Sequence, residues 1–159
     1  MNLIMEVKVD LFLSTFETGI DRKGRVSIPA RFRSLLERKK EELVLFTVPE
    51  NAFIQGCGEQ YIERIWETNL DLDQLSDEAQ YLQDILSDAL HVKLDSEGRI
   101  LLPQKLINSA NLIDNVLFAG KGETFQIWNP ETYFYEKDLR AKKRAGKGIS
   151  SLILSRKGK

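Results

Sequence analysis

The sequence predicts an α+β fold, rich in β-structure and made of two pseudo-symmetric halves, because one pattern occurs twice. The stretch IDRKGRVSIPARFRSLL at 20–36 is repeated 74 positions later by LDSEGRILLPQKLINSA at 94–110. A second block, VLFTVPENAFIQ at 44–55, is repeated at an offset of 72 by VLFAGKGETFQI at 116–127. Short runs with alternating apolar residues indicate strands, and the turn residues between them indicate hairpins. Two copies indicate two supersecondary units rather than a solenoid, which needs about three or more repeats.

Each copy opens with a tight turn between two strands. Asp21 and Gly24 in the first copy correspond to Asp95 and Gly98 in the second. An Asp that begins a β-turn accepts hydrogen bonds from the backbone that follows it, and a Gly at the fourth position takes the left-handed conformation that closes a bulged hairpin. We predict a structural role for these four residues.

A short helix is predicted after each of these hairpins. Pro29 and Pro103 are placed to begin the helices, where the missing N–H of proline costs nothing. In the first copy, Phe32, Leu35 and Leu36 have the spacing of one helix face and are predicted to face the core.

Two further helices have clear starts. Ser76 precedes two acidic residues and an apolar face that consists of Ala79, Leu82, Ile85 and Leu86. Asn129 is predicted to cap a helix that begins at Pro130 and continues to about Ala145. In the second block the offset of 72 places Phe53 opposite Phe125, and Tyr61 opposite Tyr133.

The pattern divides the chain into four segments. We expect a first repeat at 11–70, a linker and helix at 71–84, a second repeat at 85–140 and a basic C-terminal tail at 141–159.

Composition excludes several classes of protein. No apolar run approaches the ~20 residues that a membrane-spanning helix needs. The first residues, MNLIMEVKVDLFLSTFE, alternate like a strand and contain acids where a signal peptide would be apolar. With one cysteine, Cys57, and one histidine, His91, the chain lacks the ligands of an ordinary zinc cluster. We therefore expect a cytoplasmic protein with no metal, no cofactor and no small-molecule substrate.

The positive charge is concentrated although the net charge is only −1. Residues 137–159 contain nine Lys or Arg and one Asp, a net charge of +8, and residues 1–136 have a net charge of −9. Within this acidic body, residues 22–33 contain five basic residues and no acid. Such local concentration matters more for phosphate contact than the total charge.

The basic residues next to the turns are the candidate DNA-binding residues. In the first copy these are Arg22, Lys23 and Arg25, whereas the second keeps Arg99 and adds Glu97. A two-stranded ribbon can enter the major groove, where Arg forms two hydrogen bonds with guanine. The residues also permit another interpretation, in which Arg25 and Arg99 each pair with the Asp of their own turn. Arg31 and Arg33 in the following helix are weaker candidates for DNA contact.

The stretch FLSTFETGIDRKGRVSIPARFRSLL, together with LDSEGRILLPQKL and FQIW, resembles the MraZ family of bacterial transcriptional regulators. The resemblance covers roughly residues 11–140. It implies two AbrB-like (ββαβ-type) halves that form a swapped-hairpin barrel with peripheral helices, and assembly into a ring-shaped homo-oligomer. It also implies binding to double-stranded DNA at tandem promoter repeats, association with the nucleoid, and repression of the division and cell-wall gene cluster that contains the regulator's own gene.

Two other classes of function remain open from the sequence. One is an oligomeric protein-binding adaptor of the antitoxin type, in which the basic tail and the apolar stretch ISSLIL would contact a partner. The other is an enzyme, which the sequence supports least. Acidic pairs such as Asp71 and Asp73 lie in predicted linker, and no glycine-rich phosphate-binding loop is present. We expect no catalytic residues.

Overall fold

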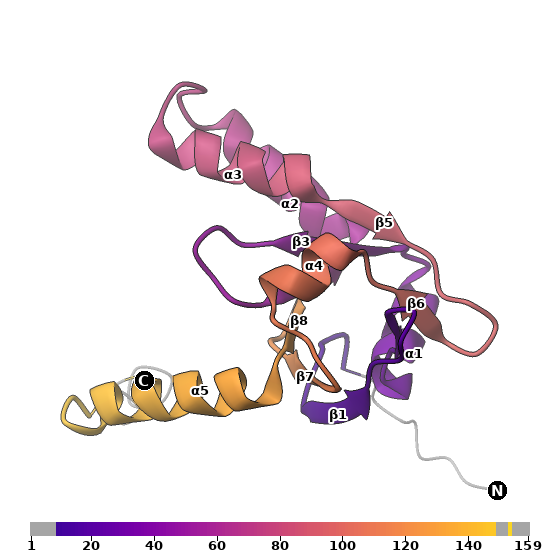
Figure 1. Cartoon of the computed structure of the whole chain (residues 1–159). Coiled ribbons are helices and arrows are strands. Elements are labelled where there is room, and N and C mark those ends of the chain that lie inside the picture. The colour runs from indigo at the N-terminus through magenta and orange to yellow at the C-terminus, as the bar shows by residue number, and fades with distance from the viewer. Residues whose placement is uncertain (1–8, 149–152, 154–159) are drawn as a thin grey trace, which may run out of the picture.

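The structure, a computed structural model, describes residues 9–148 and residue 153 (Figure 1). The strand-like alternation predicted for residues 1–8, and the stretch ISSLIL apart from Ile153, lie outside the described residues. The class is α+β, as predicted. No helix in the described part of the chain is long and apolar enough to cross a membrane.

The two halves repeat the same order of elements. The first half consists of β1 (Thr15–Gly19), β2 (Arg25–Ser27), α1 (Ala30–Lys39), β3 (Leu43–Thr47), β4 (Ile54–Gly58) and α2 (Glu59–Leu70). Helix α3 (Asp77–Asp88) then leads into the second half, which consists of β5 (Leu90–Val92), β6 (Arg99–Leu101), α4 (Gln104–Ser109), β7 (Asn115–Gly120), β8 (Phe125–Trp128) and α5 (Pro130–Ala145).

The halves exchange strands within the one chain. A six-stranded antiparallel sheet has the order β1-β7-β8-β4-β3-β5, so the first strand of each half pairs with the hairpin of the other half. Strands β2 and β6 form a separate antiparallel ribbon, in which Val26 pairs with Ile100. These two residues are equivalent in the repeat, so the pseudo-twofold relation between the halves passes between them.

The structure corrects the register predicted for the second block. Val44 and Phe46 pack against α2 and α3, whereas Leu117 and Ala119 take the same outward direction beneath α5. Side-chain direction therefore relates β3 to β7 at an offset of 73, not 72. Gly58 and Asn129 both precede a helix, which relates β4 and α2 to β8 and α5 at an offset of 71.

The hairpin loops explain this change of offset. Loop 48–53 between β3 and β4 is two residues longer than loop 121–124 between β7 and β8. Because β3 and β7 are related by 73 and not 72, the side chains of the matching VLF stretches at 44–46 and 116–118 point to opposite faces of the sheet. Because the offset after the loop is 71, the predicted equivalence of Tyr61 with Tyr133 is wrong. Tyr133 corresponds to Ile62.

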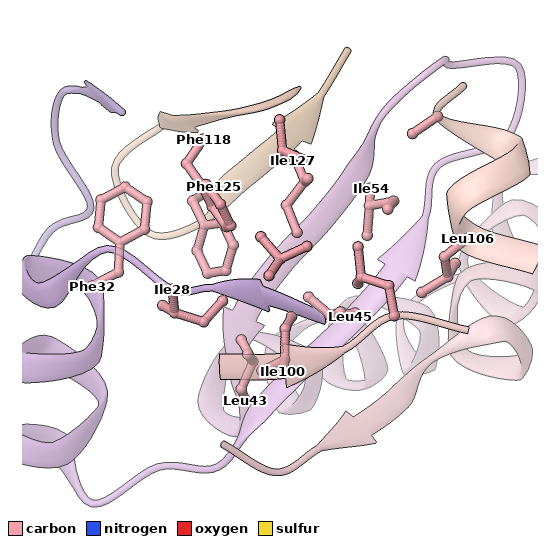
Figure 2. Packing of buried hydrophobic residues seen from close by; sticks show 14 of the residues in the cluster. Ile28, Phe32, Leu43, Leu45, Ile54, Ile100, Leu106, Phe118, Phe125 and Ile127 are labelled. Atoms are coloured by element: carbon pink, nitrogen blue, oxygen red, sulfur yellow. The ribbon is translucent and has the colours of Figure 1, made fainter. Parts of the chain in front are cut away.

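The central core lies between the large sheet and the β2–β6 ribbon. Ile28, Ile100, Leu45 and Ile127 are buried there together with an aromatic group around Phe32 (Figure 2). The predicted core positions in α1 are confirmed, because Phe32, Leu35 and Leu36 are all buried. Ile20 and Leu94, which precede the two turns at equivalent positions, border this core, so the same cluster supports the turns of both halves.

A second layer covers the outer face of the sheet. Helices α2 and α3 enclose a cluster that includes Ile65, Ile85 and the buried Cys57. Burial, and to a smaller extent the negative charge of nearby Glu41, raise the pKa of the Cys57 thiol to about 12. The thiol therefore stays protonated and unreactive at neutral pH. The predicted helix caps are also present. Ser76 Oγ accepts from the Ala79 amide at 3.2 Å, and Asn129 Oδ1 accepts from the Glu131 amide at 2.9 Å.

Candidate nucleic-acid interface

The first turn is closed by Asp21. Its Oδ1 accepts from the amides of Lys23 at 3.0 Å and Arg25 at 2.8 Å, and its backbone oxygen accepts from the Gly24 amide at 3.0 Å. The Arg25 Nε donates to Asp21 Oδ2 at 2.6 Å. Gly24 has a φ of 88°, which favours glycine. One carboxylate therefore orders the whole loop.

The second turn repeats this geometry. Asp95 Oδ1 accepts from the amides of Glu97 at 2.8 Å and Arg99 at 3.0 Å, and Arg99 Nε donates to Asp95 Oδ2 at 2.9 Å. Arg99 also forms an ion pair with Glu97, in which Nη2 lies 3.4 Å from Oε2, and the first turn has no such pair. Gly98 has a φ of 77°.

Arg25 and Arg99 are thus bound to the aspartates of their own turns, as one of the two interpretations of the sequence had it. The pairing uses Nε of each guanidinium. Each side chain stays about a third exposed, at 36% for Arg25 and 30% for Arg99. Both arginines hold a loop, and the two Nη groups of Arg25 have no carboxylate partner among the described residues.

Arg22 and Lys23 protrude from the first loop. Both are exposed, and neither forms an ion pair in the described part of the chain. The corresponding positions of the second loop are Ser96 and Glu97, so only the first loop presents two cations at its tip.

Each loop rests on the other half of the molecule. The Gly24 carbonyl accepts from the Leu102 amide at 2.9 Å, and the Gly98 carbonyl accepts from the Ile28 amide at 3.0 Å. A Cβ at Gly24 would lie 3.1 Å from Ile107 Cδ1 in α4. Neither loop is therefore a free tip, because strands and helices far away in the sequence hold its base.

Arg33 lies beside the second loop rather than the first. Its Nε donates to the Ile28 carbonyl at 3.1 Å, and a Cβ at Gly98 would lie only 2.5 Å from its guanidinium. Arg33 is partly buried, whereas Arg31 is exposed in the first turn of α1. The sequence placed both arginines next to the first loop along the chain, and the exchange of strands moves α1 to the second.

The two loops lie at opposite ends of one ribbon. In the antiparallel β2–β6 pair, Arg25 is opposite Leu101 and Arg99 is opposite Ser27. The first loop precedes Arg25 and the second precedes Arg99, so one subunit presents them in different directions.

The backbone amide of Arg25, followed by its guanidinium group, holds the pKa of Asp21 below the ordinary 3.8. The backbone amides of Arg99 and Glu97, followed by the Arg99 guanidinium group, do the same for the pKa of Asp95. A carboxyl with a lowered folded pKa stabilises the fold above its unfolded pKa, and this stabilisation disappears as the pH falls through the folded pKa. We predict that Asp21→Asn combined with Asp95→Asn lowers the urea midpoint at about pH 6, and that the deficit shrinks below about pH 4. Urea unfolding of both proteins across this range measures the difference. A deficit that stays constant down to about pH 2.5 would contradict the assignment.

One other group of side chains converges on the surface. Glu42, Glu59 and His91 bring one ligand atom each within 4.8 Å of one another. His91 Nε2 lies 3.2 Å from Glu59 Oε2, and both side chains are well exposed. We interpret His91 and Glu59 as a surface pair with Glu42 beside it, and we assign no metal to this group.

Comparison with known proteins finds a family whose model covers both turns. The family model described as "MraZ protein, putative antitoxin-like" matches residues 11–51 and 85–145, which contain both turns. A protein of Pelagibacter ubique named Transcriptional regulator MraZ is 38% identical over 144 residues, which is 89% of this chain and 92% of that protein. Proteins of the same name from Rickettsia canadensis and Rickettsia peacockii are 35% and 34% identical, over 79% and 84% of this chain and 85% and 89% of their own lengths.

Proposed function

This chain belongs to the MraZ family of transcriptional regulators, and we propose that it acts by binding double-stranded DNA through its first loop. One observation carries the proposal. Arg22 and Lys23 stand exposed on a loop whose base is ordered by Asp21 and by the opposite half of the molecule. A preordered loop loses little conformational entropy when it binds.

The chemistry of the loop suits the major groove. Arg22 can form two hydrogen bonds with a guanine, a contact worth about 1–3 kcal/mol of discrimination between bases. Lys23 is suited to a phosphate, which positions the loop without reading sequence. Arg25 holds the loop through Nε and keeps its Nη groups for a second contact with DNA. The two weaker candidates for DNA contact differ. Arg31 is exposed and can contact DNA, whereas Arg33 packs against the second loop and supports it.

A single loop with two or three cations binds DNA weakly. Each subunit has one first loop, and its second loop lies at the opposite end of the ribbon. Several first loops can therefore reach one DNA only if several subunits assemble. We propose a homo-oligomer, in the form of a ring, that engages tandem promoter repeats together, with a gain in avidity of roughly 10²–10⁴ over one loop. In this arrangement Arg99 and its loop are mainly structural.

The proposed target is the promoter of the division and cell-wall gene cluster that carries the protein's own gene, and the proposed outcome is repression at the nucleoid. DNA upstream of the gene should show regularly spaced protected segments in a footprint. A reporter driven by that DNA should rise in activity when the protein is removed. Absence of protection at low salt, together with an unchanged reporter, would contradict the proposal.

An adaptor that binds another protein is the second candidate. The exposed Phe134, Tyr135 and Leu139 of α5 favour it, because such side chains commonly mark a contact surface. Purification of the protein with a second protein in fixed ratio, and no retardation of promoter DNA, would favour the adaptor.

A further inference from the structure

The α2–α3 hairpin, residues 59–88, is strongly acidic. It contains nine Asp or Glu and a single base, Arg64, which pairs with Glu123. On α2, Glu63, Trp66, Glu67 and Leu70 have the spacing of one helix face. Trp66 and Leu70 are 49% and 58% exposed, and the two glutamates form no ion pair among the described residues. We call these four residues the α2 face.

Helix α5 has the opposite character. Its residues 137–145 contain five bases and one acid, and Tyr133 near its start is its only buried residue. Tyr135, Leu139, Lys142 and Lys143 have the spacing of one face, which we call the α5 face. Tyr135 is 62% exposed. Lys142 forms an ion pair within the helix, in which its Nζ lies 3.0 Å from Asp138 Oδ2. Figure 1 shows α5 at the bottom of the view and the α2–α3 pair at the top.

The apolar residues of the α5 face are not required by the fold of the half. At the structural offset of 71, Tyr135 and Leu139 correspond to Arg64 and Thr68 of α2, which are exposed and polar. The same fold is therefore built in the first half with polar side chains at these positions. Apolar residues on a helix that buries only its first turn point to a contact outside the chain.

We propose that the α5 face of one subunit packs on the α2 face of a second copy, with the helices antiparallel. From Glu63 to Leu70 is seven residues, and so is the span from Lys142 back to Tyr135; each covers about 10 Å of helix. Antiparallel alignment brings Leu70 to Tyr135, Trp66 to Leu139, and Glu63 to Lys142. Opposite charges then meet at the apolar contact, which gives orientation as well as attraction.

This contact joins two different surfaces. Each copy therefore uses its α5 face on one neighbour and its α2 face on another, and such a contact closes into a ring when the rotation between neighbours permits. The inference specifies the assembly on which the proposed function relies. It concerns the protein without DNA, so its failure would leave DNA contact by Arg22 and Lys23 to be judged separately.

Cross-linking tests which surfaces meet. Chains with Leu70→Cys and with Tyr135→Cys are co-expressed, then oxidised with oxidised glutathione, which accepts the two electrons as the two thiols form a disulfide. Cross-linked dimers should form in the mixture and be scarce with either variant alone. A single chain with both substitutions should give a ladder of higher species. Buried Cys57 stays out of the reaction.

The control pairs Leu70→Cys with Ile113→Cys, another apolar residue that is 68% exposed but lies outside the α5 face. Equal cross-linking in the control mixture, or strong cross-linking of Leu70→Cys alone, would overturn the proposal.

Charge reversal tests the electrostatic part. Glu63→Lys with Glu67→Lys should lower the mass of the assembly in DNA-free solution, and so should Lys142→Glu with Lys143→Glu. All four substitutions in one chain should restore the mass, because the charges are exchanged. Glu37→Lys on α1, also an exposed acid, serves as the control and should leave the mass unchanged. Two reversals that each leave the mass unchanged, or a combined variant that fails to reassemble, would overturn the contact.

Discussion

Replacing both Arg22 and Lys23 by alanine should abolish retention of promoter DNA at physiological salt while leaving the fold intact. Both side chains are exposed and take no part in the hydrogen bonds that order the loop, which run through Asp21 and the backbone. Removing the pair of hydrogen bonds between one Arg and a base costs about 1–3 kcal/mol. When two or more loops of an assembly engage one DNA, these costs add for every loop, so affinity should fall roughly 100-fold or more.

A mobility-shift titration at several salt concentrations measures this fall in affinity. Removal of Lys23 from a phosphate should also flatten the dependence of log affinity on log salt, by about 0.9 for each phosphate that the variant no longer neutralises. The matched control replaces Ser96 and Glu97, the same two positions in the second loop, and should bind DNA at least as tightly as the parent because it removes an acid. Full affinity in the Arg22 and Lys23 variant would show that the first loop does not bind DNA.

The largest effect on stability is expected for Phe32→Ala. Phe32 is 1% exposed and is the centre of an aromatic group, with ring centroids 5.1 Å from Phe12, 5.1 Å from Phe125 and 5.4 Å from Phe16. Truncation leaves a cavity that these rings cannot close, which costs about 3–5 kcal/mol. Because a domain is stable by only about 5–15 kcal/mol, this variant should lose a large part of its stability.

Urea unfolding at one fixed protein concentration measures the change, since association of subunits also stabilises the fold. Leu75→Ala is the control, because Leu75 is 84% exposed and its truncation should change stability by less than about 0.5 kcal/mol. A similar urea midpoint for the two variants would mean that the aromatic group is not the centre of the core.

The turns were predictable from sequence because their interactions are local. Asp21 binds amides two and four residues further on, and the glycine with positive φ lies between them. The same holds for the helix caps at Ser76 and Asn129, where donor and acceptor lie two or three residues apart.

The role of the arginines was less predictable. The sequence leaves open whether Arg25 pairs with Asp21 or faces a ligand, and the structure shows the pair. It also shows that Arg33 supports a glycine 65 residues away, a contact that no local pattern signals. Nor does the sequence indicate the α2 and α5 faces, since exposed and buried apolar residues look alike until the neighbouring elements are known.

The duplicated halves, the α+β class and the closed turns with a cationic first tip can all be predicted from the amino-acid sequence. These follow from hydrogen bonds and periodicities within a few residues of the chain. Three features become visible only in the folded chain: the first strand of each half pairs with the other half, α1 lies beside the second loop, and the repeat changes offset from 74 to 73 and then to 71. Strand pairing depends on contacts between residues that are 45 to 104 positions apart in the chain, and a one-residue shift in that pairing turns every side chain to the opposite face.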